Sequence, residues 1–229
     1  SSRGLGDVYK RQIETSSVYC SIGLAKNKEI YIEHSQDENT HGKNIFGFID
    51  SLLKKSQLEK EELDFIALSV GPGSFTGLRV GCSVAQGLAF GLQKKILPLS
   101  SLLVLAQTVF LEQKAKELFI VKEAHMNDLY VGKYIRKNND LAHPLINDAA
   151  IKKTELSDFI SSDNKEIICS DCHEFLDYLI KPSLLETNNH AKGLLHLACY
   201  LDDLDTRLKN PEEVYPAYLS GTDQWKRVK

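Results

Sequence analysis

Four glycines stand close together in GPGSFTGLRVG, residues 71–81, directly after the apolar run FIALSV. A strand followed by a glycine turn and the start of a helix presents free backbone N–H groups that can bind a phosphate. Candidates for such a turn are Gly71, Gly73, Ser74 and Thr76, with Ser74 or Thr76 as the helix cap. The turn is not a Walker loop, because no Gly-Lys-Ser/Thr follows it.

Thr15 and Ser16, within IETSS at residues 13–17, form a second candidate phosphate contact. An ordinary hydrogen-bonded turn accounts for the same residues. None of the seven histidines stands four residues from another, as a helical His-x-x-x-His metal pair requires. The sequence also lacks a Ser/His or Cys/His arrangement suited to a nucleophile. We therefore expect neither a catalytic residue nor a metal ligand in this chain.

The five cysteines are an odd number and lie mostly far apart, which favours reduced thiols over a disulfide framework. Cys169 and Cys172 belong to CSDCH, residues 169–173, a pattern that also attaches c-type haem. Haem attachment requires export, and the opening residues lack the apolar core of a signal peptide. A zinc site would need a second pair of ligands. A redox pair would need the thioredoxin context.

Composition describes an ordinary globular protein of one large or two small domains, with 229 residues, a formal net charge of −3 and 42% hydrophobic residues. That charge does not attract nucleic acid, so a partner would have to share any RNA contact. The basic end WKRVK, with Trp225, is typical of a solvated tail, and RNA stacking is the alternative. No apolar stretch approaches the roughly 18 residues of a membrane span, and we expect a cytoplasmic protein.

Hydrophobic periodicity predicts alternating strands and helices. The first half starts with a hairpin over 19–25 and 29–35, and continues with a helix over 41–58, a strand over 65–70, a helix over 74–92, a strand over 96–99 and a helix over 100–115. The second half starts with another hairpin over 117–124 and 128–137, and continues with a segment at 153–162, a strand over 166–170 and helices over 172–180 and 191–205. The run at 65–70 is typical of a strand buried on both faces of a parallel sheet.

Both halves open with a hairpin and then alternate, which indicates a duplicated α/β unit. We predict one lobe over residues 13–105 and a second over 106–229, with the break near 99–115. The opening SSRGLGDVYKRQ is polar, although the hairpin after it calls for an apolar first strand. We therefore predict that residues 1–12 are a non-native leader that replaces a strand.

Small residues recur every fourth position in the helix over 74–92. One row consists of Gly77, Gly81, Ala85 and Ala89, and Gly87 and Gly91 repeat the spacing on another face. Such rows let a neighbouring backbone approach closely, and burial must offset the helix propensity that glycine loses. The helix is therefore either an interior helix of a monomer or packs on its own sheet and on a partner subunit.

Four segments resemble the TsaB family (formerly YeaZ), which takes part in the biosynthesis of threonylcarbamoyladenosine in tRNA. The central one is SVGPGSFTGLRVGCSVAQGLAFGLQ, and the others are IETSS at 13–17, EAHMNDLYVGKY at 123–134 and YPAYLSGTDQWK at 215–226. The resemblance covers essentially everything after residue 12. It implies an actin-like ATPase fold of two related lobes, with mixed sheets flanked by helices. It also implies a turn at CSDCH and a final segment that packs back on the N-terminal lobe.

The resemblance implies a non-catalytic subunit that pairs with TsaD through its N-terminal lobe, with the ATPase TsaE joining the complex. The assembly transfers a threonylcarbamoyl group to N6 of adenosine 37 in tRNAs that read ANN codons, so ATP and a metal ion are expected on the partner subunits. An exposed pair of apolar helices would also allow a homodimer in the absence of TsaD. On this resemblance the apolar helices at 41–55 and 74–92 supply the partner interface. Its predicted residues are Ile45, Phe46, Ile49, Leu53, Phe75, Gly77, Leu78, Gly81, Ala85 and Leu88.

The alternative is an independent enzyme of the same fold, an ATP-dependent small-molecule kinase or a peptidase. A kinase of this class needs phosphate loops in both lobes and a glycine-rich loop for adenosine. Beyond residue 100 the glycines are Gly132, Gly193 and Gly221, which stand too far apart to build such loops. The sequence therefore favours the non-catalytic subunit.

Overall fold

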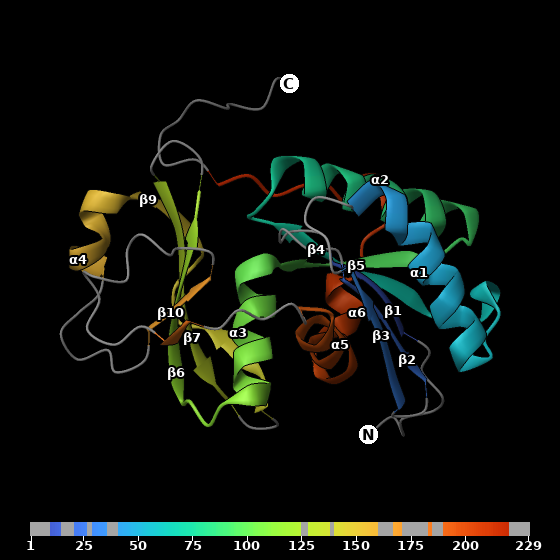
Figure 1. Ribbon diagram of the computed structural model, residues 1–229, viewed down its shortest axis with the longest axis horizontal. Coiled ribbons are helices and arrows are strands. Elements are labelled where there is room, and N and C mark those ends of the chain that lie inside the picture. Colours follow the sequence, from blue (N-terminus) through green and yellow to red (C-terminus); the bar gives the residue numbers. More distant parts are fainter. Residues whose placement is uncertain are drawn as a thin grey trace.

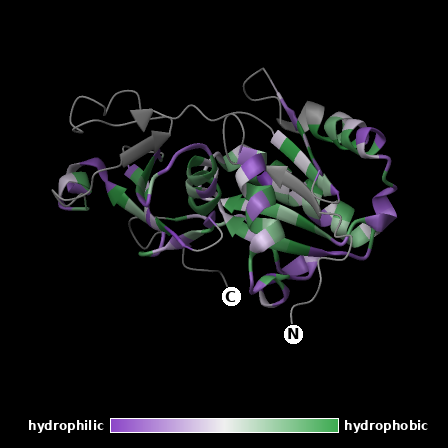
Figure 2. Ribbon diagram, turned by 90° about the horizontal axis from the view of Figure 1, so that it is seen from below, coloured by the Kyte–Doolittle hydropathy of each residue, from purple (hydrophilic) through white to green (hydrophobic). Residues whose placement is uncertain are grey.

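The chain folds around two β-sheets flanked by helices, in a computed structural model (Figure 1). The structure describes residues 10–14, 21–26, 29–35, 41–124, 128–137, 140–159, 167–170, 183–184 and 190–219. Hydrophobic residues follow the central strands, and hydrophilic residues follow the outlying turns and helices (Figure 2).

The N-terminal sheet has five strands in the order β3-β2-β1-β4-β5. They are β1 (Lys10–Glu14), β2 (Ser21–Lys26), β3 (Glu29–His34), β4 (Phe65–Gly71) and β5 (Lys95–Ser100). Strands β1, β2 and β3 form an antiparallel meander, whereas β1, β4 and β5 run parallel. The first five side chains of β4 are buried, which confirms the predicted strand with two buried faces.

Part of the predicted leader lies in the middle of this sheet. Lys10, Arg11 and Gln12 pair through their backbones with β2 on one side and β4 on the other. Ladder hydrogen bonds use only backbone N–H and C=O groups, so a polar segment can occupy a strand position that the fold provides. The non-native origin of residues 1–12 stays a prediction.

Helices cover both faces of the N-terminal sheet, and alternate residues of β4 point to opposite layers. Ile66 and Leu68 pack with α2 (Phe75–Gly91), which lies beside α1 (His41–Ser56) (Figure 1). Phe65 and Ala67 belong to the core cluster of α3 (Ser101–Glu112) and α5 (His190–Tyr200). The sheet is therefore the middle of three layers.

The C-terminal sheet repeats the same plan. It runs β8-β7-β6-β10-β11, with β9 also paired to β7. Its strands are β6 (Glu117–Glu123), β7 (Asp128–Arg136), β8 (Ala142–Pro144), β9 (Ala149–Lys152), β10 (Ile167–Ser170) and β11 (Ser183–Leu184). Pairs β6–β7 and β7–β8 are antiparallel, and β6–β10 and β10–β11 are parallel. Each of these four pairings has its counterpart in the first sheet, which confirms the duplicated unit and the predicted fold class, and the β7–β9 pairing is an addition to the shared plan.

One hydrophobic core joins the two lobes through α3. Its cluster includes Leu97 of the first sheet, Ile120 of the second and Leu197 of α5. Every residue of α3 from Ser101 to Phe110 is buried, so this part of the helix has no side that faces water. The predicted lobe boundary at residue 105 falls inside α3, and it stays a prediction.

Short elements complete the described chain. They are the 3-10 turn η1 (Lys60–Glu62), the turn η4 (Lys153–Glu155), α4 (Leu156–Phe159), α6 (Leu204–Arg207) and the turn η6 (Pro211–Glu213). The helix predicted over 191–205 ends at Tyr200, and α6 follows it as a separate turn. The helix predicted over 172–180 lies outside the described residues.

Candidate functional site: the glycine turn and the outer face of two helices

The glycine turn after β4 holds the chain's own C-terminal segment. Gly71 has φ +116°, a conformation that glycine adopts far more readily than other residues. The N–H of Ala217 donates a hydrogen bond of 2.7 Å to the carbonyl of Val70. A Cβ atom added to Gly71 would lie 2.6 Å from the carbonyl oxygen of Ala217. Position 71 therefore requires glycine, because Ala217 lies too close to leave room for a side chain.

Ser74 caps α2, as predicted for this position. Its hydroxyl accepts a hydrogen bond of 3.2 Å from the N–H of Gly77, which satisfies one of the free donors at the helix start. Thr76 is exposed and Gly73 is partly exposed. Binding of phosphate by Gly71, Gly73, Ser74 and Thr76 stays a prediction, and Thr15 and Ser16 lie outside the described residues.

We call residues 209–218 the strap. Lys209 and Ile96 exchange two backbone hydrogen bonds of 2.8 and 2.9 Å, which fix one end of the strap to β5. The Gln86 side chain of α2 donates to the carbonyls of Pro211 (3.0 Å) and Val214 (2.9 Å). Val214 is buried in the cluster that α2 forms with β4. The strap therefore runs along one side of α2 from β5 to the glycine turn.

The first row of small residues on α2 faces the chain's own interior. Gly77, Gly81, Ala85 and Ala89 are all buried, and Ala85 and Ala89 pack against Ile66 and Leu68 of β4. Val80, Val84, Leu88 and Leu92, on a different side of α2, pack against the buried face of α1. The sheet, the strap and α1 thus cover three sides of α2.

The predicted partner interface stays a prediction, and burial divides its ten residues into two groups. Six of its ten residues are buried inside the chain and offer no surface to a partner in this conformation: Ile45, Ile49, Gly77, Leu78, Gly81 and Ala85. Their apolar pattern reflects contact with the N-terminal sheet and between α1 and α2. Phe46 and Phe75 are exposed, and Leu53 and Leu88 are half-buried. These four remain candidates for an interface.

The outer face of α1 and α2 carries exposed residues of which the predicted interface includes only Phe46. Phe90 of α2 is 78% exposed, and Phe46 of α1 is 58% exposed. Beside them, Gly47, Gly87 and Gly91 have nothing within 4 Å of an added Cβ. We define the outer face by Phe46, Gly47, Asp50, Ser83, Gly87, Phe90 and Gly91, all of which are exposed.

The sequence does hold a signal for this outer face. A glycine in a helix interior lowers helix stability by roughly 1 kcal/mol relative to alanine. Inside the chain, Gly87 and Gly91 gain no compensating close contact. The sequence shows that Gly87 and Gly91 stand four residues apart. That spacing does not distinguish a contact with a partner from a contact inside the chain.

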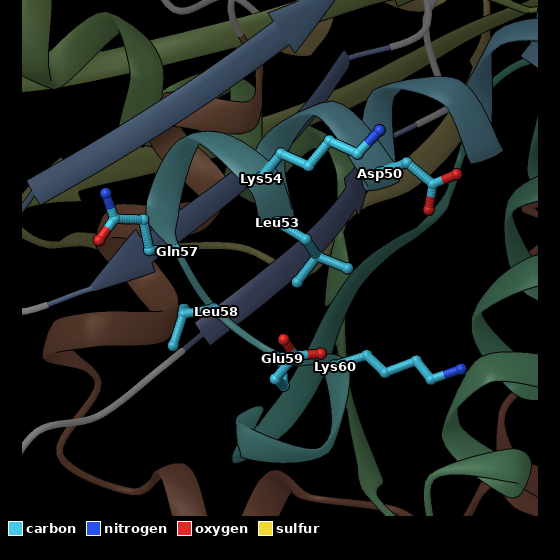
Figure 3. Close-up of a pocket in the computed structure, with 7 residues that line it drawn as sticks. All are labelled: Asp50, Leu53, Lys54, Gln57, Leu58, Glu59 and Lys60. Carbon is cyan, nitrogen blue, oxygen red and sulfur yellow. The ribbon is translucent and has the colours of Figure 1, made fainter.

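A pocket of about 270 Å³ lies at the end of α1, next to the outer face (Figure 3). Asp50, Leu53, Lys54 and Gln57 of α1 line it together with Leu58, Glu59 and Lys60. Its two carboxylates and two ammonium groups balance, so the pocket does not select an anion or a cation by charge.

A partly buried carboxylate network connects the two lobes. Tyr134 of β7 and Ser100 at the end of β5 each donate a hydrogen bond to the carboxylate of Asp148. Ser100 also accepts from the N–H groups of Leu102 and Leu103 at the start of α3. Burial raises the pKa of Asp148 and of Tyr134. This network has no histidine to activate a nucleophile, and its geometry is that of a structural link.

Other reactive side chains offer little chemistry. Burial raises the pKa of the Cys82 thiol to about 11, so the thiolate is scarce at neutral pH. No group of three His, Cys, Asp or Glu side chains in the described part of the chain could hold a metal ion. Cys172 lies outside the described residues, and only the backbone of Cys169 is described, within β10. No helix among the described residues is long and apolar enough to cross a membrane.

Comparison with known proteins gives consistent relatives. The family model for TsaD, tRNA N6-adenosine threonylcarbamoyltransferase, matches residues 32–178. The tRNA threonylcarbamoyladenosine biosynthesis protein TsaB of Haemophilus influenzae is 37% identical over 125 residues, which cover 55% of this chain and 53% of that protein. TsaB of Buchnera aphidicola subsp. Schizaphis graminum is 31% identical over 146 residues, 64% of this chain and 70% of that protein. The chain thus spans about half of the first relative's length.

A solved structure shares the fold. YeaZ from Pseudomonas aeruginosa aligns with a TM-score of 0.78 over 93% of this chain and 100% of that chain, at 22% sequence identity. The structural similarity therefore includes both lobes. At 22% sequence identity it supports the fold alone.

Proposed function

Because the chain belongs to the TsaB family of tRNA threonylcarbamoyladenosine biosynthesis proteins, we propose that it is a subunit of the machinery that modifies adenosine 37. In this role it pairs with TsaD, and TsaE joins the pair. The complex transfers a threonylcarbamoyl group to N6 of that adenosine in tRNAs that read ANN codons. Because tRNA is the substrate, we place the protein in the cytoplasm.

The observation that carries the proposal is the outer face of α1 and α2. Large apolar side chains exposed beside glycines form a surface onto which another helix can pack closely. Phe46 and Phe90 would supply the aromatic anchors that dominate many protein interfaces. Gly87 and Gly91 would admit the partner's backbone, which gives a reason for glycine at two exposed helical positions.

We propose that the chain has no catalytic residue of its own. Ala217 fills the Gly71 side of the glycine turn that the sequence offers as a phosphate site. Ser74 already uses its hydroxyl to cap α2. ATP and the metal ion would then belong to the partner subunits, and this chain would act by holding TsaD in a productive arrangement.

Reconstitution tests the proposal. This chain, TsaD and TsaE from the same genome would be purified and combined singly, in pairs and together, with ATP, threonylcarbamoyl-adenylate and an unmodified ANN-reading tRNA. Nucleoside mass spectrometry would measure threonylcarbamoyladenosine. We expect product from the complete mixture and none from this chain alone. Product formed by this chain alone, or full activity without it, would contradict the proposed role.

A further inference from the structure

The end of the strap is clasped to the first turns of α2 by three side chains. The rings of Tyr218 and Phe75 lie with their centroids 5.5 Å apart and their planes tilted by 34°. The Nε of Arg79 donates a hydrogen bond of 3.1 Å to the Tyr218 hydroxyl. The guanidinium carbon of Arg79 lies 3.7 Å from the centre of the Phe75 ring. Each of the three residues thus contacts both of the others, and we call this group the clasp.

Attachment of the strap does not depend on the clasp. The bonds of Lys209 to β5, the two bonds from Gln86 and the burial of Val214 already hold the strap along α2. All three clasp residues are exposed, so they fill no part of the core. Exposed ring pairs and cation–π pairs each contribute modestly to stability. The effect of the clasp is therefore local, on the first turns of α2.

The clasp borders the outer face. At 100° per residue, Phe75, Arg79 and Gln86 fall on one stripe of α2, and Thr76, Ser83 and Gly87 fall on the adjacent, exposed stripe. An Arg79 side chain released from Tyr218 and Phe75 could swing across that exposed stripe. The clasp holds this long charged side chain to one side and keeps the first turns of α2 ordered.

We propose that Arg79 and Tyr218 are positioning residues for partner binding, which hold the outer face of α2 in the form that docks. This inference rests on the proposed pairing with TsaD. A surface that is ordered before binding loses less conformational entropy when it docks. Loss of the clasp lowers the fraction of molecules whose α2 is in the binding conformation. The apparent affinity for TsaD falls in proportion to that fraction.

The test compares the full chain with Arg79→Ala, Tyr218→Ala and the double variant, measuring the dissociation constant for TsaD from the same genome. Tyr215→Ala is the matched control, because Tyr215 lies on the same strap and is 68% exposed, against 48% for Tyr218. We expect each single variant to bind about three- to ten-fold more weakly, as the loss of one such contact implies. The double variant should lose little more, because both changes open the same clasp. Tyr218→Phe, which keeps the ring contact, should recover part of the loss.

Amide hydrogen exchange of the free chain gives a second readout. We expect faster exchange in the first turns of α2 in the two clasp variants, and unchanged exchange there in Tyr215→Ala. If Tyr218→Ala bound TsaD as tightly as the unaltered chain, the positioning role would be overturned, even if Arg79→Ala bound weakly through loss of a direct contact. Additive losses in the double variant would overturn it too. Failure of the unaltered chain to bind TsaD would instead remove the proposed function, and this inference with it.

Discussion

Gly193 of α5 lies against Thr108 of α3 with no room for a side chain between the two helices. A Cβ atom added to Gly193 would lie 2.8 Å from the backbone nitrogen of Thr108 and 2.5 Å from the carbonyl oxygen of Val104. Backbone atoms cannot move aside as a flexible side chain can. This contact sets how closely α5 approaches α3. Helix α3 contributes to the hydrophobic core that joins the two lobes.

Gly193→Ala should therefore destabilise the chain although alanine favours helix. Overpacking costs about 1 to 3 kcal/mol and occasionally more, and because the clash here is with backbone atoms we expect a cost above the roughly 1 kcal/mol of helix propensity gained. Urea denaturation would measure the free energy of unfolding. Gly87→Ala is the matched control, because its added Cβ meets nothing within 4 Å, and it should leave stability unchanged or raised. Equal effects of the two substitutions would contradict the close approach of α3 and α5.

Gly71→Ala should loosen the strap. The substitution combines an unfavourable φ of +116° with a clash against the Ala217 carbonyl, and we expect a loss of about 1 to 3 kcal/mol in the free energy of unfolding. Limited proteolysis should cut the variant sooner within residues 211–219. Gly91→Ala, at an open helical position, serves as control. Unchanged protection of the strap in Gly71→Ala would mean that Ala217 does not seal the turn.

His196 should make stability depend on pH. Burial lowers the pKa of its imidazole, and the Nδ1 atom lies 3.2 Å from Gln107 Nε2, an amide donor that suits a neutral acceptor ring. The stability that the neutral ring contributes is present above the ordinary histidine pKa of about 6.5, and it is lost as pH falls through the lower native value. His196→Gln should flatten the fall in melting temperature below about pH 6.5. His143→Gln, at an exposed site, should keep it.

The sequence predicted the strands well where local pattern decides the outcome. The hairpin of β2 and β3 follows from alternating apolar residues, and the double-sided burial of β4 follows from the continuous run FIALSV. Local pattern also limited the cap of α2 to Ser74 or Thr76, because a strand, glycines and a hydroxyl residue before a helix are a short-range signal, and the structure shows that Ser74 is the cap.

The interface could not be assigned residue by residue from the sequence. Both rows of small residues on α2 have the same spacing, and only the tertiary packing reveals that Ala85 faces the sheet while Gly87 faces outward. The partner of Gly71 was hidden for a related reason. Ala217 stands far along the chain, and nothing local in either segment specifies their contact.

The central claim is that the outer face of α1 and α2 binds TsaD. The most direct test measures the dissociation constant for TsaD of Phe90→Glu and Phe46→Glu against Leu145→Glu, a control that alters an exposed apolar residue after β8 in the other lobe. Melting temperatures would show that all three variants remain folded. We predict that each of the first two binds at least about thirty-fold more weakly, as loss of an aromatic anchor of 2 kcal/mol or more implies, and that the control binds as the unaltered chain does. Native affinity in both Phe90→Glu and Phe46→Glu would contradict the claim.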